Sequence, residues 1–143
     1  MSRVDDAVEW FCRGAACSQA IAGTYGPSLG LPREQAMKLG SGFAGGMRLA
    51  QTCGAVTGAF LVLGLKHAGA DCDQRGGREN VYAAIRDFAT RFQQRNNTVV
   101  CKELLGCDIS TPDGVQRATQ EGLFRTICPK LVQDAAEILE EML

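Results

Sequence analysis

The chain has 143 residues, of which 45% are hydrophobic and 22% charged, and its formal net charge is −1. This composition is typical of a soluble protein with one hydrophobic core, so residues 1–143 are expected to form a single domain. The small charge gives no electrostatic basis for binding nucleic acid. The longest apolar segment, 55–65, is too short to cross a bilayer, and no N-terminal signal peptide is apparent. A cytoplasmic protein without membrane insertion is therefore expected.

The N-terminal third predicts short helices separated by glycine and proline. A first helix follows Ser2, which is a suitable cap, and a second runs from about Cys17 to Tyr25 before Gly26 and Pro27 end it. A third, short helix spans 32–40. The next segment, GSGFAGGM at 40–47, has four glycines in eight residues and predicts a loop that turns tightly or passes close to another backbone.

A helix from about Thr52 to Ala68 is apolar on nearly all sides, so it is predicted to be the central, buried helix. Gly54 and Gly58 give this helix a small-residue face against which a neighbouring segment of the same chain can pack closely. The connection after it, GADCDQRGG at 69–77, is rich in turn residues.

The C-terminal half also has helical periodicity. The pattern predicts a long amphipathic helix over 78–96, a short helix at CKELLG (101–106), a helix start at Thr111 and Pro112, and a last helix over 129–143. No alternating β-pattern of useful length occurs. The expected fold is all-α: a compact bundle of about five main helices with additional short ones.

Four of the seven cysteines lie where these helices are predicted to begin, namely Cys17, Cys53, Cys101 and Cys128. Free N–H groups and the positive end of the helix dipole favour a thiolate over a thiol, which makes a cysteine there a better nucleophile and a better metal ligand. We therefore predict a thiol pKa below about 8.5 for Cys53, the expected attacking thiolate. Lys102 is expected to favour the Cys101 thiolate, and Ser18 and Gln19 are expected to hydrogen-bond to the Cys17 sulfur.

The other cysteines carry weaker signals. Cys12 lies near the end of an amphipathic helix and Cys72 in an acidic turn, while Cys107 is close enough in sequence to Cys101 to serve as a reserve ligand. No C-x-x-C pair, ferredoxin spacing or C-x-x-C-H haem motif is present. His67, the only histidine, is predicted far along the central helix from Cys53, which makes a Cys–His catalytic couple improbable.

Together these segments resemble the family named for the cysteine pattern C-GCAxxG-C-C, to which redox activity is ascribed because of its cysteines. The matching pieces are CSQAI, SGFAGGM followed by TCGAVTGAFLVLGLK, CKELLGCDISTPDG and GLFRTICPKLVQDAAEILEEML. Here Gly54 stands between Cys53 and Ala55, unlike in the family's name. The resemblance implies a small prokaryotic protein in which Cys17, Cys53, Cys101 and Cys128 are the site residues.

Three functions remain open on this evidence. In the first, two of the four cysteines cycle between dithiol and disulfide with a redox partner protein or a small thiol, which would make the protein a thiol–disulfide oxidoreductase. In the second, the same four cysteines, Cys17, Cys53, Cys101 and Cys128, bind zinc or an iron–sulfur cluster. In the third, the chain is a helical structural or partner-binding protein with incidental cysteines. The disulfide pairing and a homodimer also stay open.

Overall fold

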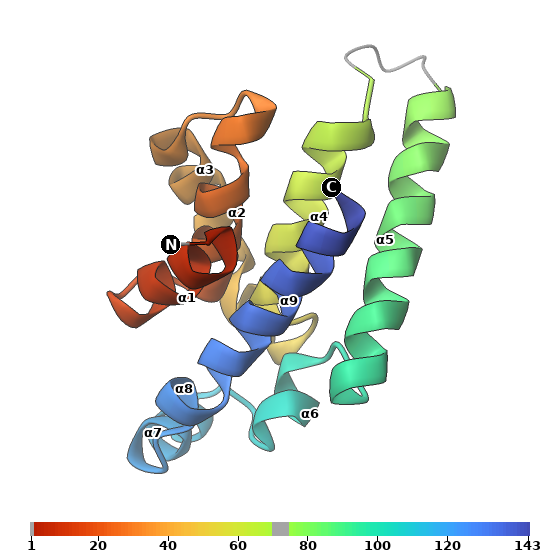
Figure 1. Cartoon of the computed structure of the whole chain (residues 1–143). Helices are drawn as coiled ribbons and strands as arrows, with labels where there is room; N and C mark the ends of the chain where they lie inside the picture. The colour runs from red at the N-terminus through yellow and green to blue at the C-terminus, as the bar shows by residue number, and fades with distance from the viewer. Residues whose placement is uncertain (1, 70–74) are drawn as a thin grey trace.

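A computed structural model of the chain describes residues 2–69 and 75–143, and this part of the chain is all-α, as predicted (Figure 1). Within it, the one β-type pairing is an isolated bridge between Thr52 and Val100. The α-helices are α1 (Arg3–Cys12), α2 (Cys17–Tyr25), α3 (Arg33–Gly40), α4 (Gly54–His67), α5 (Arg75–Asn96), α6 (Cys101–Leu105), α7 (Pro112–Gln120), α8 (Leu123–Thr126) and α9 (Cys128–Met142). Short helical turns occur at Pro27–Leu29, Ser41–Phe43 and Gly46–Ala50.

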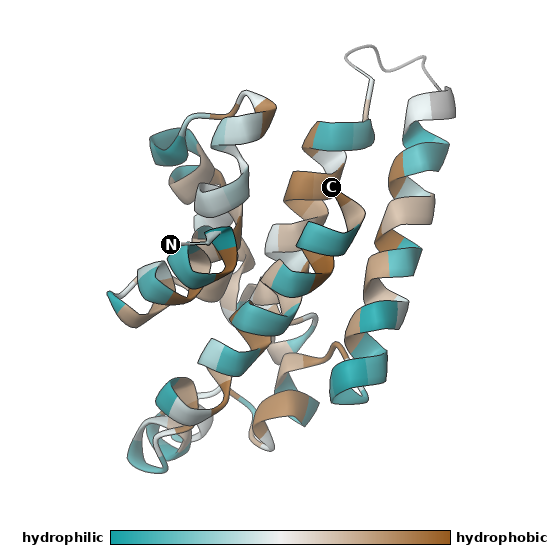
Figure 2. Ribbon diagram, in the orientation of Figure 1, coloured by the Kyte–Doolittle hydropathy of each residue, from teal (hydrophilic) through white to brown (hydrophobic). Residues whose placement is uncertain are grey.

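Helix α4 is the central helix of the fold, and the prediction that it is buried is confirmed. Ala55, Val56, Ala59, Val62 and Leu63 are all fully buried. In Figure 2, α4 is mainly white to brown below its teal last turn, whereas much of the face of α9 turned to the viewer is teal. No helix in the described ranges has both the length and the apolar character needed to cross a membrane.

Helices α2 and α4 pack at very short range because Gly58 has no side chain. A Cβ atom at Gly58 would lie 2.8 Å from the Ser18 carbonyl oxygen and 3.0 Å from the Ser18 Cα. A larger residue would therefore push the two backbones apart. The prediction that a small-residue face on this helix serves packing within the chain is confirmed.

Helix α9 joins the two sides of the bundle. Its buried face, which includes Leu131, Val132, Ala135, Ile138 and Leu139, follows the predicted helical spacing. On the α5 side, the nearly buried Asp134 carboxylate accepts hydrogen bonds from Arg95, Asn96 and Lys130 at 3.3, 3.1 and 2.6 Å. These charge-assisted bonds offset the cost of burying the carboxylate and hold α5 on α9.

Most predicted helix ends agree with the structure. Ser2 caps α1 by accepting a bond from the Asp5 N–H at 3.1 Å, and Thr111 caps α7 by accepting one from the Gly114 N–H at 3.0 Å. The last helix begins at Cys128, one residue earlier than predicted, and α8 was not predicted. Part of the predicted turn at 69–77 lies outside the described residues.

Candidate functional site: a cavity lined by four cysteines

The four cysteines at the predicted helix starts all line one cavity of about 150 Å³. Cys53 and Cys101 are 5% and 6% exposed, and Cys17 and Cys128 are half-buried. The remaining lining is mainly apolar and consists of Phe11, Ala16, Ala44, Gly45, Arg48, Gly54, Leu104, Leu105, Ile109, Phe124 and Leu131. Segments separated by more than a hundred residues in sequence thus bring four thiols to one place.

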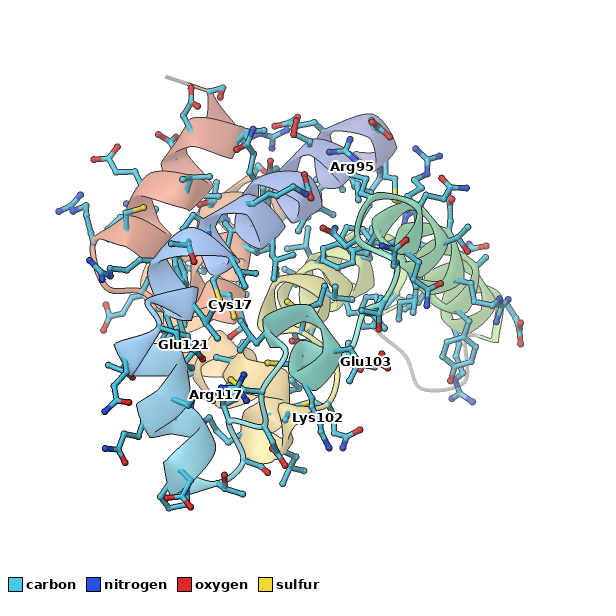
Figure 3. All side chains as sticks on the ribbon, turned by 90° about the horizontal axis from the view of Figure 1, so that it is seen from below. Cys17, Arg95, Lys102, Glu103, Arg117 and Glu121 are labelled. Atoms are coloured by element: carbon cyan, nitrogen blue, oxygen red, sulfur yellow. The ribbon has the colours of Figure 1, made fainter. Side chains whose placement is uncertain are left out.

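The thiols meet because their helices begin at the same end of the molecule. Helices α2, α4 and α9 start at the lower end in Figure 1 and run upward, and the short helix α6 lies beside their starts. Cys17, Cys101 and Cys128 are the first residues of α2, α6 and α9, and Cys53 is the N-cap of α4. Seen from below, Cys17 lies near the middle of the molecule (Figure 3).

None of these four helices has a side-chain cap at its start. The N-cap residues are Ala16, Cys53, Val100 and Ile127, and none makes the side-chain hydrogen bond that Ser2 and Thr111 make on α1 and α7. Backbone N–H groups favour the thiolates of Cys17 and Cys53 at the starts of α2 and α4. At the start of α6 the Cys101 N–H instead donates to the Gln51 carbonyl, and in α9 Pro129 has no N–H.

Cys17 is held against the start of α4. A Cβ atom on Gly54 would lie only 2.2 Å from the Cys17 Sγ, so this position accepts glycine alone without displacing the sulfur. Backbone groups of Gly45, Ser18 and Gly54 favour the Cys17 thiolate by hydrogen bonding. The expected side-chain bonds to sulfur are absent: the Ser18 hydroxyl donates to the Gly40 carbonyl and the Gln19 amide to the Met37 carbonyl.

Cys53 and Cys101 are fixed by backbone bonds between the segments that precede α4 and α6. The Cys53 N–H donates to the Val99 carbonyl at 2.7 Å, and the Cys101 N–H donates to the Gln51 carbonyl at 2.6 Å. These two bonds, with the adjacent bridge at Thr52 and Val100, hold both cysteines at the same wall of the cavity.

Burial, rather than the helix starts, determines the protonation of these thiols. Desolvation raises the pKa of Cys17 and raises that of Cys53 well above its ordinary value, although the N–H groups of Ala55 and Val56 oppose the rise at Cys53. Burial likewise raises the pKa of Cys101 to about 11 and that of Cys128 to about 12. The prediction of a lowered pKa for Cys53 is therefore wrong. A helix start contributes about 1 kcal/mol, whereas full burial shifts a pKa by up to about 3–5 units.

A charge on one sulfur also raises the pKa of the neighbouring thiols, and Cys17 acts on the other three in this way. A charge on Cys17 raises the pKa of Cys53, Cys101 and Cys128, and for each of them it is the largest effect after burial. The cavity therefore disfavours several thiolates at once. Cys101 has a smaller effect of the same kind on Cys53 and Cys128.

The other cysteines and the histidine lie outside this lining. Cys107 is buried beside α7, where its Sγ is 3.7 Å from the Gly114 carbonyl oxygen, and it does not reach the cavity as a reserve ligand. Cys12 is exposed at the end of α1, and His67 is the last residue of α4. Cys72 lies outside the described residues.

The cavity has one charged lining residue among those described, Arg48, which the sequence did not indicate. Its charge lowers the pKa of Cys101, whereas the predicted helper, Lys102, is exposed and is not among the causes of that shift. Arg48 follows Gly45, Gly46 and Met47, and all four residues have φ between 59° and 65°. They form a left-handed turn, which costs about 1–2 kcal/mol for each residue other than glycine.

The spacing of the thiols limits the kind of metal site that they can form. Among the described residues, no three His, Cys, Asp or Glu side chains stand close enough to ligate one ion. A single zinc ion therefore does not fit the thiols as they are arranged. An iron–sulfur cluster places its cysteine ligands on different iron atoms, so its four thiolates surround a volume rather than a point.

The fold and the cavity thus define an all-α protein with a buried four-thiol centre. A model of the family described as "Putative redox-active protein (C_GCAxxG_C_C)" matches residues 15–142. This match covers most of the chain, and the protein belongs to that family. No curated protein matches the chain, and no solved structure does.

Proposed function

We propose that the protein is a redox protein whose cavity thiols store two electrons as a dithiol–disulfide couple. The observation that carries the proposal is that Cys17, Cys53, Cys101 and Cys128 all line one cavity. Membership of a family described as redox-active supports it. The class of activity is thiol–disulfide exchange.

Cys17 is the attacking thiol in this proposal and Cys53 is the resolving thiol. Cys17 is half-buried, whereas Cys53 is 5% exposed, so Cys17 is the more accessible of these two thiols to an incoming disulfide. Backbone groups from three segments favour the Cys17 thiolate, and its sulfur lies against Gly54, the residue next to Cys53. The sequence-based prediction instead has Cys53 as the attacking thiol and leaves the resolving thiol open among Cys17, Cys101 and Cys128.

The exchange is balanced in two steps. The Cys17 thiolate attacks one sulfur of a disulfide substrate, a mixed disulfide forms, and the substrate's other half leaves and takes a proton. The Cys53 thiolate then attacks the Cys17 sulfur, which forms the Cys17–Cys53 disulfide and releases the second half as a thiol. Two electrons and two protons have passed from the two cysteines to the substrate.

The walls of the cavity favour a small disulfide as substrate. Cys53 and Cys101 are almost fully buried, and they share the cavity with apolar side chains such as Phe11, Leu104 and Phe124. A folded partner protein would have to bring its own disulfide inside these walls, whereas a low-molecular-weight disulfide can enter. The raised thiol pKa values also imply exchange that is slow at neutral pH and faster in alkali.

Ligation of an iron–sulfur cluster is the second candidate. It is favoured by the number and origin of the sulfurs: four thiols, each at an uncapped helix start, surround one cavity. Four cysteine thiolates are the usual complete ligand set of such a cluster, and the free N–H groups would stabilise its negative charge. In this case the protein would carry single electrons.

One experiment separates the two candidates. Protein purified without oxygen would be analysed for iron, sulfide and visible absorption, and its thiols would be counted before and after mild oxidation with peptide mapping. The exchange proposal predicts metal-free, colourless protein that reversibly loses two thiols as a Cys17–Cys53 disulfide. Stoichiometric iron and sulfide would overturn it in favour of the cluster.

Matched variants test the assigned roles. Cys17→Ser and Cys53→Ser are expected to abolish the reversible loss of two thiols, whereas Cys12→Ser, at the exposed end of α1, is expected to leave it unchanged. If Cys17→Ser still forms an internal disulfide at the normal rate, the attacking residue has been assigned incorrectly.

A further inference from the structure

Arg48 provides a positive charge at the edge of an otherwise apolar cavity. It is exposed to solvent and lines the cavity together with the four cysteines. The other residues that line this cavity carry no formal charge when the thiols are protonated. An apolar site with one oriented charge is the usual arrangement for fixing one end of a small ligand.

The Arg48 guanidinium is not paired with any carboxylate in the part of the chain that the structure describes. In the described residues it forms no ion pair with a carboxylate and no side-chain hydrogen bond, although Arg3, Arg91, Arg95 and Arg117 all do. Its five N–H donors are therefore available to an external anion, and their planar arrangement matches a carboxylate.

The backbone holds Arg48 in this place at a cost. Its φ of 59° and that of Met47 are left-handed, and neither residue is glycine. The turn folds the Arg48 side chain back toward Gly45, whose Cβ position would lie 3.2 Å from the Arg48 Nη1. Gly45 is also one of the residues whose backbone favours the Cys17 thiolate. The same strained turn thus sets both the environment of the Cys17 sulfur and the position of the guanidinium, and such strain is concentrated at functional sites.

Arg48 also lines a second, more open hollow on the outside of the cavity. This hollow has a volume of about 500 Å³, and its other lining residues include Ile109, Ser110, Thr111 and Gln116. Arg48 and Ile109 line both spaces. A ligand bound to Arg48 in the outer hollow is therefore adjacent to a residue that also lines the thiol cavity, and Ser110, Thr111 and Gln116 offer hydroxyl and amide groups to its polar part.

We propose that Arg48 is the substrate-binding residue that selects small disulfides carrying a carboxylate. The carboxylate binds the guanidinium in the outer hollow, and the disulfide of the same molecule reaches into the apolar cavity toward Cys17. This inference rests on the exchange function proposed above and uses the same balanced two-step exchange. It adds the substrate's charge and the residue that recognises it.

The test uses three small disulfides that differ in charge. Fully reduced protein would be mixed with dithiodiglycolate (anionic), hydroxyethyl disulfide (neutral) or cystamine (cationic), and formation of the Cys17–Cys53 disulfide would be followed by mass spectrometry. Each rate would be divided by the rate of the same reagent with mercaptoethanol, a neutral thiol, to remove intrinsic reactivity. The wild-type protein is expected to prefer the anionic reagent over the cationic one by about tenfold, and salt should reduce that preference.

Two variants separate charge recognition from a structural role of the turn. Arg48→Gln is expected to slow oxidation by dithiodiglycolate about tenfold while leaving the neutral reagent within about twofold, and Arg48→Lys is expected to retain most of the preference. Equal normalised wild-type rates for the three reagents, or an equal loss for all three in Arg48→Gln, would overturn the proposal for Arg48 and leave the exchange function standing. If no reagent forms the Cys17–Cys53 disulfide in the wild-type protein, the exchange function itself has failed, and the role of Arg48 fails with it.

Discussion

The two ends of helices α2, α4 and α9 differ sharply in how they are built. Away from their starts, the helices pack through fully buried side chains such as Tyr25, Val62, Leu63, Ile138 and Leu139. At their starts they lack side-chain caps, surround a cavity and lie beside a left-handed turn. A missing cap costs about 1 kcal/mol, so the thiol end gives up stability that the packed end supplies. The same helices thus provide a rigid support and a site that is locally unfavourable for folding.

The difference between the ends is tested most strongly at Gly54. Gly54→Ala places a Cβ atom 2.2 Å from the Cys17 Sγ and 2.9 Å from the Ala44 Cα. We expect it to lower the free energy of unfolding by about 3 kcal/mol and to slow the formation of the Cys17–Cys53 disulfide at least tenfold. Urea unfolding and thiol mapping would measure the two effects.

Substitutions at Gly58 and Gly64, two other glycines of α4, provide the comparison for Gly54→Ala. Gly58→Ala disturbs the contact with Ser18, the residue after Cys17, so it should lower stability by about 2 kcal/mol. It should slow oxidation less than Gly54→Ala does, because its Cβ atom does not meet the Cys17 sulfur itself. Gly64 has no atom within 4 Å of its Cβ position, and Gly64→Ala should raise stability by up to about 1 kcal/mol. If all three substitutions changed the oxidation rate equally, the thiol end and the packed end of α4 would not differ in their effect on the thiols.

The pH dependence of stability is expected to come from the thiol end. A thiol ionises at about pH 8.5 in the unfolded chain, whereas the pKa of Cys101 is raised to about 11 and that of Cys128 to about 12 in the fold. Above pH 8.5 the unfolded state therefore loses protons that the folded state keeps, and stability falls as the pH rises toward 11–12. The expected loss is about 1.4 kcal/mol per pH unit for each such thiol.

Urea unfolding between pH 8 and 10.5 would measure this slope. The double variant Cys101→Ala, Cys128→Ala should reduce it relative to wild type, and Cys12→Ser should not, since Cys12 is exposed. An unchanged slope in the double variant would show that the pKa values of these two thiols are not raised in the folded state.

The strain in the turn beside the cavity should be measurable at Met47. With φ at 59°, Met47→Gly is expected to raise the free energy of unfolding by about 1 kcal/mol, because glycine adopts this conformation without a steric penalty. Leu49→Gly is the matched control: Leu49 is 63% exposed and has no positive φ, so glycine there should be destabilising. Thermal unfolding of both variants would show whether the turn is strained.

The smallest expected effect comes from adding a cap at the start of α2. Ala16 has the extended φ and ψ of an N-cap but no capping oxygen. Ala16→Ser should raise stability by about 0.5 kcal/mol, and it should slow oxidation of Cys17 because the new hydroxyl competes with sulfur for the first N–H groups of α2. A faster oxidation would contradict the proposed use of these N–H groups.

Most of the helices, and the four cysteines that line the cavity, could be predicted from the sequence. Local signals act over a few residues, so Ser2, Thr111 and the Gly26–Pro27 pair set helix ends that the structure reproduces to within a few residues. The order of the cysteine segments indicated Cys17, Cys53, Cys101 and Cys128 as one group, and all four line the cavity. Their proposed roles in exchange still rest on the experiments above.

The protonation of those thiols and the position of Arg48 depend on how the folded chain packs. The sequence shows a cysteine at a helix start and predicts a lowered pKa, but the desolvation that raises the pKa of Cys53 comes from α2, α4, α6 and the chain between them packing together. The position of Arg48 depends on four consecutive left-handed residues, two of which are not glycine, and local propensity disfavours that conformation. Both effects arise from contacts between segments far apart in the chain, which local sequence patterns do not contain.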